Sequence, residues 1–328
     1  MDLSGRPLVD TPLDQILFVD RTEELRRAVA STDRRSNVLI TGAPGIGKTS
    51  LLHRLAHDLR GRGYQPTFVD AAPASSVQDL IDLIRWRLGN APVVVPVVQA
   101  ARQMAGQEVL GEAATLTRLL ASLAEGINPN DRRVLLIDEP PSGEIGHTLF
   151  GRLRDEVWQL PFLWVVAIDE HQRAALTRPP ADAFFPVVLE LKPLDPKDAL
   201  DLLQKRLDGA PVAGLDRIVE IAQGSPRRLL ALARELVINE QPAEEILSRE
   251  RKRNAVLDEL GDSASLLFSF LQEHGASSAS DEDLLTAMGW TRARATQVLN
   301  SLEEAGLAAG RREKGGRRKL YELTSLPD

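Results

Sequence analysis

The stretch that decides the fold is Gly42-Ala43-Pro44-Gly45-Ile46-Gly47-Lys48-Thr49. It matches the P-loop pattern, in which two glycines separated by four residues precede a lysine and a hydroxyl residue. Glycines let the backbone N–H groups approach phosphate oxygens, and a helix that begins there adds the positive end of its dipole. Lys48 is expected to reach the β- and γ-phosphates and Thr49 to hold Mg²⁺, with Ser50 beside them. A buried strand over 36–41 and a helix over 49–60 favour this interpretation over a plain glycine turn.

A second motif, Val-Leu-Leu-Ile-Asp-Glu at 134–139, is an apolar strand that ends in two acids. Asp138 is expected to hold the Mg²⁺, and Glu139 to polarise the attacking water as general base. P-loop kinases and many GTPases lack such a glutamate, and no Asn-Lys-x-Asp signal for guanine is present. The two motifs therefore predict ATP and Mg²⁺ as cofactors.

Working outward, apolar strands alternate with helices until about Pro193, which predicts an α/β fold with a parallel sheet. Residues 146–159 are expected to be helical, while 90–111 is either an extra packed helix or a moving loop. After residue 193 the chain reads as helices only, ending in a charged stretch over 240–253. We expect a P-loop core over 1–192, an all-α lid and linker over 193–253, and a third domain over 254–328.

The last domain has the pattern of a winged helix-turn-helix. Three helices are expected over 264–274, 281–288 and 291–305, followed by a hairpin with Gly315 and Gly316 at its tip. In such a domain the third helix enters the major groove and the wing meets phosphates.

Basic residues are concentrated on these two elements. The segment 291–319 carries eight basic and three acidic residues, a net +5, within a chain of net −7. Duplex DNA is the expected partner, and a winged helix that binds protein is the alternative. The candidate contacts are Arg292, Arg294 and Gln297 in the helix and Arg311, Arg312, Lys314, Arg317, Arg318 and Lys319 in the wing.

With these motifs, the chain resembles AAA+ ATPases of the origin-recognition or initiator-like group, and the related STAND NTPases. Residues 18–25, Phe-Val-Asp-Arg-Thr-Glu-Glu-Leu, are similar to the N-terminal box that packs near adenine, although Asp20 replaces the usual glycine. Asp169 ends the next strand, where the family usually has a hydrogen-bond donor, and an ionised aspartate cannot donate.

The resemblance also implies catalytic arginines. In this family an arginine after that strand reaches the nucleotide of a neighbouring subunit, and Arg178 is better placed for this role than Arg173. Gly-Ser-Pro-Arg-Arg at 224–228 resembles the start of the last lid helix, whose arginine contacts the γ-phosphate. Arg227 is the expected carrier, with Arg228 in reserve.

The amino-acid composition excludes several kinds of functional site. The chain has no cysteine, which excludes disulfides and cysteine nucleophiles, and its five histidines show no metal-ligand spacing. Neither a signal peptide nor a membrane span is predicted, so a cytoplasmic protein is expected.

Three function classes remain. The first is an AAA+ switch that hydrolyses ATP, forms a homo-oligomer through ATP-bridged interfaces and binds duplex DNA, as in initiation, helicase loading, transposition or mobile-element defence. The second is a STAND-type signalling NTPase whose winged helix binds a protein partner or regulates the ATPase. The third, a small-molecule kinase, does not explain the lid, Arg227 or the winged helix.

Overall fold

The computed structural model describes residues 1–89, 112–140, 142–312 and 318–324. Contacts divide the chain into two units, which are described separately. The sheet unit comprises Arg6–Lys192, and the helical unit comprises Met1–Gly5 with Pro193–Asp328. The expected insertion at 90–111 lies outside the described residues.

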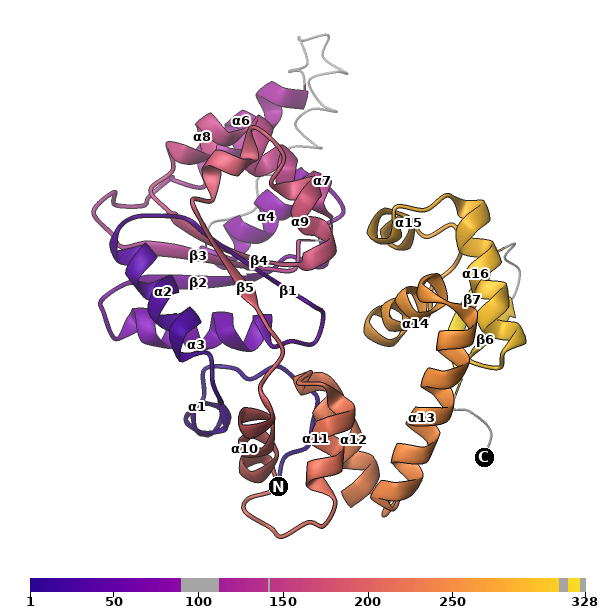
Figure 1. Ribbon diagram of the computed structural model, residues 1–328. Coiled ribbons are helices and arrows are strands. Elements are labelled where there is room, and N and C mark those ends of the chain that lie inside the picture. The colour runs from indigo at the N-terminus through magenta and orange to yellow at the C-terminus, as the bar shows by residue number, and fades with distance from the viewer. Residues whose placement is uncertain (90–111, 141, 313–317, 325–328) are drawn as a thin grey trace. The chain divides into compact units, whose positions relative to one another are not determined.

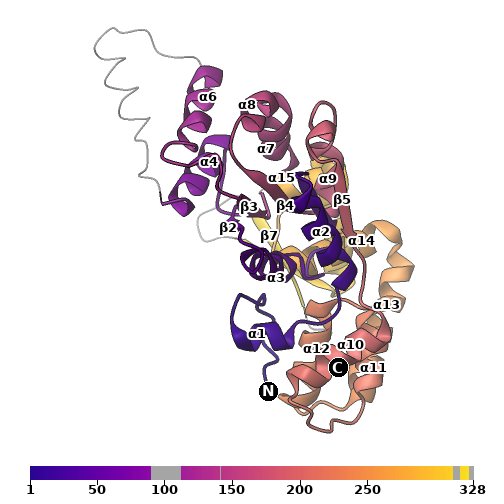
Figure 2. The same cartoon turned by 90° about the vertical axis from the view of Figure 1, so that its left-hand side faces the viewer.

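The sheet unit is built on five parallel strands in the order β2-β3-β4-β1-β5 (Figure 1). Helices cover both faces of the sheet, with α2 and α3 on one face and α4, α7 and α9 on the other (Figure 2), so the central strands are continuous apolar runs. Gly42 pairs with Asp169, and Asp70 with Asp138, so the ends of four strands meet at one edge. The strands are β1 (Val38–Gly42), β2 (Gln65–Asp70), β3 (Arg133–Asp138), β4 (Leu163–Asp169) and β5 (Val187–Leu191).

The core of this unit has two halves, one on each face of the sheet. Leu39 belongs to one half and Ile40 to the other, because successive side chains of a strand point to opposite faces. The helices of the sheet unit are α1 (Pro12–Leu17), α2 (Thr22–Asp33), α3 (Lys48–Arg60), α4 (Val77–Arg87), α6 (Glu112–Ser122), α7 (Gly143–His147), α8 (Arg154–Trp158) and α9 (Glu170–Leu176). The predicted α/β fold with a parallel sheet is therefore confirmed.

The segment predicted to be helical over 146–159 is helical, but it is divided into α7, a π-helical turn and α8. A π-helical turn, Thr148–Arg152, interrupts it, with the Leu153 amide donating to the Thr148 carbonyl at 3.0 Å. Gly151 lies within this turn, where a Cβ atom would come within 3.0 Å of the His147 ring. The wider turn accommodates this close packing, which hydrophobic periodicity does not report.

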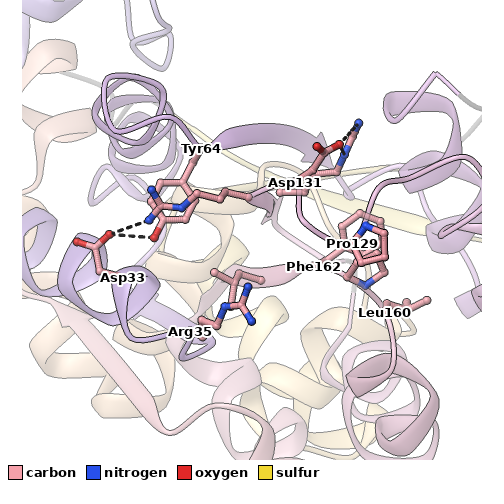
Figure 3. Close-up of a pocket in the computed structure, with 11 residues that line it drawn as sticks. Asp33, Arg35, Tyr64, Pro129, Asp131, Leu160 and Phe162 are labelled. Atoms are coloured by element: carbon pink, nitrogen blue, oxygen red, sulfur yellow. Dashed lines mark hydrogen bonds and ion pairs between the residues drawn. The ribbon is translucent and has the colours of Figure 1, made fainter.

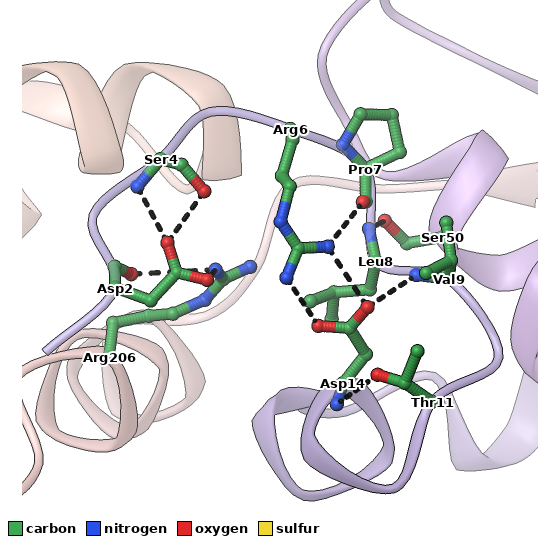
Figure 4. Close-up of polar contacts among 10 residues, drawn as sticks. All are labelled: Asp2, Ser4, Arg6, Pro7, Leu8, Val9, Thr11, Asp14, Ser50 and Arg206. Carbon is green, nitrogen blue, oxygen red and sulfur yellow. Dashed lines mark hydrogen bonds and ion pairs between the residues drawn. The ribbon is translucent and has the colours of Figure 1, made fainter.

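From Pro193 onward, the helical unit begins with three helices, α10 (Pro196–Arg206), α11 (Leu215–Ala222) and α12 (Pro226–Val237). The first residues of the chain are fastened to α10, since the Asp2 amide donates to the Arg206 carbonyl at 2.8 Å and its carboxylate pairs with the Arg206 guanidinium at 3.2 Å (Figure 4). The helix α13 (Ala243–Leu260) follows. It occupies most of the charged stretch expected to be a linker and runs through residue 253.

The end of the chain consists of α14 (Asp262–His274), α15 (Glu282–Met288), α16 (Arg292–Glu304) and the antiparallel pair β6 (Ala308–Arg312) and β7 (Lys319–Leu323). Ser277 forms an isolated bridge with Tyr321, with N–O distances of 3.0 and 2.8 Å. Leu267, Leu299 and Tyr321 are buried in a core shared by the helices and the hairpin. These elements fit the predicted winged arrangement. Within the described part of the chain, no helix is both long and apolar enough to cross a membrane.

Candidate nucleotide site

The P-loop connects the end of β1 to the start of α3. A Cβ atom at Gly42 would lie 3.0 Å from Ile46 Cγ2 and 3.1 Å from both the Cβ and the carbonyl oxygen of Leu191, so a larger residue would require these neighbours to shift. Gly47 has a φ of +103° with open space around it, so its constraint is the left-handed backbone rather than crowding. The loop thus has the backbone freedom that the motif predicts.

Lys48 is buried at the first turn of α3, with 3% of its surface exposed. Its Nζ donates to the Gly42 and Ala43 carbonyls at 3.2 Å each and to Asp169 Oδ1 at 2.5 Å. Asp169 lies opposite Gly42 in the β1–β4 register and is itself buried. The sequence predicts Asp169 at this edge, but it carries no signal for the ion pair with Lys48.

Asp138 is buried at the end of β3, with 5% exposed. Burial raises the pKa of Asp138 from 3.8 to about 7, opposed by a hydrogen bond from the Thr49 hydroxyl. Its Oδ1 is buried and has no hydrogen-bond partner among the described residues. An unsatisfied buried carboxylate oxygen beside a hydroxyl fits Mg²⁺, which prefers hard oxygen ligands.

Glu139 differs sharply from its neighbour. It is exposed, with a φ of +47°, and its amide donates to the Ala167 carbonyl at 3.0 Å. A positive φ is uncommon for a residue with a Cβ atom. The strand therefore ends with one buried carboxylate and one exposed carboxylate, as the metal and base assignments would require.

The P-loop and the start of α3 are supported from two sides. Buried Arg21, with a φ of +65°, donates to the Lys192 carbonyl at 2.7 Å and to the P-loop Ile46 carbonyl at 3.4 Å. The Leu8 amide donates to Ser50 Oγ at 3.0 Å (Figure 4). Arg21 lies in the 18–25 box, but its role as a brace was missed because both acceptors are backbone carbonyls distant in sequence.

The segment around Leu8 is itself held by a buried carboxylate. Asp14, 1% exposed, pairs with Arg6 at 2.7 Å and accepts from the Val9 amide at 2.9 Å (Figure 4). The hydrogen bond from Arg6 is the main reason that the pKa of Asp14 is lowered to about 2.

The arginines expected to act as fingers are engaged elsewhere in this structure. Arg178, 43% exposed, pairs with Glu144 at 2.5 Å. Arg173 pairs with Glu170 at 3.3 Å and Glu190 at 3.8 Å. Their catalytic roles stay predictions.

In the helical unit, Arg227 lies in the first turn of α12, whose N-cap Ser225 accepts from the Arg228 amide at 3.4 Å. Arg228 forms an ion pair with Glu250 of α13, which also pairs with Arg253. Glu250 is 4% exposed, so this cluster is a buried structural link rather than a solvent-facing charge. Arg228 is therefore less favoured as the alternative arginine that contacts the γ-phosphate, and the role of Arg227 stays a prediction.

The expected DNA-contacting residues fall into two groups. Arg292, Arg294, Gln297, Arg311, Arg312 and Arg318 are exposed. Arg294 donates to Gln297 at 3.1 Å and to Ser263 at 2.9 Å, and Arg318 donates to Ser278 at 3.0 Å. Lys319, in contrast, pairs with Glu303 of α16 at 2.5 Å and fastens the hairpin to that helix. Lys314 and Arg317 lie outside the described residues.

A cavity of about 230 Å³ lies at the starts of the strands, where it is lined by Tyr64, Arg133 and Leu163 (Figure 3). Polar side chains that line the cavity interact with each other. The Tyr64 hydroxyl donates to Asp33 at 2.9 Å, and the Arg132 guanidinium lies 3.8 Å from the Tyr64 ring centroid. The P-loop and Asp138 lie at the other ends of the strands, so this cavity is not the candidate nucleotide site.

Comparisons with known proteins agree with this geometry. The family model "Novel STAND NTPase 3" matches residues 18–86. Orc1 of Aeropyrum pernix, solved in complex with DNA, has a TM-score of 0.53 at 20% identity, covering 95% of this chain and 90% of its own.

Two further structures match. ORC2 of A. pernix, solved in ADPNP–ADP complexes, has a TM-score of 0.51 at 16% identity, covering 95% of this chain and 94% of its own. Cdc6p of Pyrobaculum aerophilum has a TM-score of 0.51 at 15% identity, covering 94% and 93%. No curated protein matches. The chain therefore has the fold of these Orc1, ORC2 and Cdc6p structures, as the sequence resemblance predicted.

Proposed function

We propose that this chain is an AAA+ switch that binds and hydrolyses ATP, oligomerises with ATP and binds duplex DNA through its C-terminal helices and hairpin. The observation that carries the nucleotide part is the strand edge where the P-loop, Lys48 and Thr49 meet buried Asp138. One oxygen of the Asp138 carboxylate has no hydrogen-bond partner among the described residues, and it lies near a hydroxyl and a buried ammonium. Burying such an oxygen costs free energy unless a charged ligand compensates it.

Each residue has a distinct role in this proposal. The backbone of residues 42–49 cradles the phosphates, and Lys48 neutralises them. Thr49 and Asp138 would hold Mg²⁺, which when bound shields the charge of the phosphates. Glu139, which is exposed, accepts a proton from the attacking water. Arg227 contacts the γ-phosphate, and Arg178 of a neighbouring subunit stabilises the charge that develops.

The DNA part depends on charge placement. Arg292, Arg311 and Arg312 are exposed, and no ion pair joins them to a described residue. Solvated arginines on a helix start and a hairpin are suited to phosphate contacts, which cost little desolvation and release counterions. The same fold in Orc1 was solved in complex with DNA, which supports the proposal.

The second candidate is a STAND-type signalling NTPase, favoured by the family match over residues 18–86. Its C-terminal domain would bind a protein partner or regulate the ATPase instead of binding DNA. The two candidates share the nucleotide site and differ in the ligand of the helical unit.

The nucleotide assignment is tested by titrating ATP with Mg²⁺ into the purified chain and into Lys48→Ala. The wild type should bind ATP, and the variant should lose binding because the loop then lacks the ammonium that neutralises the phosphates. Lys205→Ala, which removes a partly exposed lysine paired with Asp201 on α10, is the matched control. Normal ATP affinity in Lys48→Ala would contradict the assignment.

A further inference from the structure

Asp169 directs its carboxylate to the P-loop lysine instead of to the helix that it precedes. It is the N-cap residue of α9, where aspartate commonly accepts from the backbone, yet it makes no side-chain cap bond there. Its Oδ1 instead accepts from Lys48 Nζ at 2.5 Å, with 11% of the Asp169 side chain and 2% of the Lys48 side chain exposed. Lys48 is thus already charge-neutralised inside the protein.

The coordination of Lys48 leaves little capacity for another acceptor. An ammonium carries three N–H donors, and Lys48 has three acceptors in the structure, namely two P-loop carbonyls and Asp169. A phosphate oxygen that binds this ammonium must therefore displace or share one of them. The carboxylate is the acceptor that also repels a phosphate, because both are negatively charged.

We propose that Asp169 competes with nucleotide phosphates for Lys48, and so weakens the binding of ATP more than that of ADP. This inference rests on the proposed nucleotide function and adds a specificity role to one residue. The difference between the nucleotides follows from charge: ATP brings a γ-phosphate to the ammonium that Asp169 occupies, while ADP does not. Asp169 would then favour an empty or ADP-bound resting state.

The test compares ATP and ADP affinities, measured by calorimetry with Mg²⁺, in the wild type, Asp169→Asn and Asp169→Ser. Both substitutions remove the charge and keep a group that can accept from Lys48. Glu170→Gln is the matched control, because it removes one negative charge at the adjacent residue, whose exposed side chain pairs with Arg173. Thermal melting without nucleotide verifies that each variant is folded. If Asp169→Asn does not fold, Asp169→Ser is used in its place.

We expect Asp169→Asn to bind ATP roughly tenfold more tightly and ADP by a smaller factor, with Glu170→Gln unchanged. In steady-state hydrolysis the variant should lower KM more than it changes kcat. Unchanged or weaker ATP binding in both Asp169 variants would overturn the proposal, because the aspartate would then support the lysine instead of competing for it.

A failure of the proposed function would look different. If neither the wild type nor any Asp169 variant binds ATP, the nucleotide assignment itself fails. If the wild type binds ATP and Lys48→Ala does not, while the Asp169 variants equal the wild type, only the competition fails.

Discussion

The strand edge beside the P-loop and the C-terminal hairpin both gather charge, but they hold it in opposite environments. Lys48 and Asp169 are buried and pair with each other, and Asp138 is buried beside the Thr49 hydroxyl, whereas Arg311 and Arg312 are exposed. Buried charges are costly to desolvate and fix a definite geometry, while solvated charges are cheap and screened by salt. We therefore expect the stability and activity of the strand edge to depend on pH and on small changes to single side chains. DNA binding by the hairpin should depend on ionic strength.

The largest effect is expected for Glu139, the exposed carboxylate at the strand edge beside the P-loop. Glu139→Gln keeps the shape of the side chain but cannot accept the proton of the attacking water, so hydrolysis should fall by roughly 10²- to 10³-fold with ATP binding retained. Phosphate release and calorimetry measure the two properties, with Glu170→Gln as the control. Turnover equal to that of the wild type would remove Glu139 as the base.

A smaller effect is expected from the buried acid. Because burial raises the folded-state pKa of Asp138 to about 7, above its ordinary value of 3.8, the unfolded chain binds fewer protons between these values. The wild type without nucleotide should therefore lose stability as pH rises from about 4 to about 7, by roughly 3 kcal/mol.

Asp138→Asn should remove this loss, so its melting temperature should exceed that of the wild type at pH 8 and approach it near pH 4. The matched control is Asp182→Asn, since residue 182 is exposed in the same unit. Parallel pH profiles for the wild type and Asp138→Asn would show that the carboxyl is not destabilised by burial.

The smallest effect is expected at the hairpin. Arg311→Ala with Arg312→Ala removes two candidate phosphate contacts, so the slope of log affinity for duplex DNA against log salt should decrease by about 2. Between 50 and 200 mM salt this corresponds to about a tenfold difference. Fluorescence anisotropy measures it, and Arg251→Ala with Lys252→Ala, on exposed positions of α13, removes the same charge. An unchanged slope would exclude contacts between these arginines and phosphates.

The α/β fold could be predicted from the sequence because its signals are local. The glycines of 42–49 impose a turn between a strand and a helix, and the buried strands are continuous apolar runs. The break at Thr148–Arg152 could not be predicted, since it depends on Gly151 packing against His147 and Ala181, the latter 30 residues further along the chain. Likewise, charge alone did not reveal that the stretch over 240–253 is mostly helical, because its buried face is set by contacts such as that of Glu250 with Arg228.

Part of the candidate site could be predicted from the sequence, because some of its residues belong to local motifs. Lys48, Thr49 and Asp138 follow from motifs of fixed spacing, whereas the Lys48–Asp169 pair joins residues 121 positions apart and depends on the register of β1 with β4. Arg21 was missed because its acceptors are carbonyls, which carry no residue-type signal. Lys319 shows the converse, since a basic residue expected to contact DNA pairs with Glu303 within its own domain.

The measurement that tests the central claim most directly is steady-state ATP hydrolysis with and without duplex DNA, at low and moderate salt. If the sheet unit is an ATPase coupled to a DNA-binding helical unit, DNA should change the hydrolysis rate, and added salt should remove that change. A measurable rate that is indifferent to DNA at every salt concentration would contradict the DNA-switch proposal and favour the signalling NTPase.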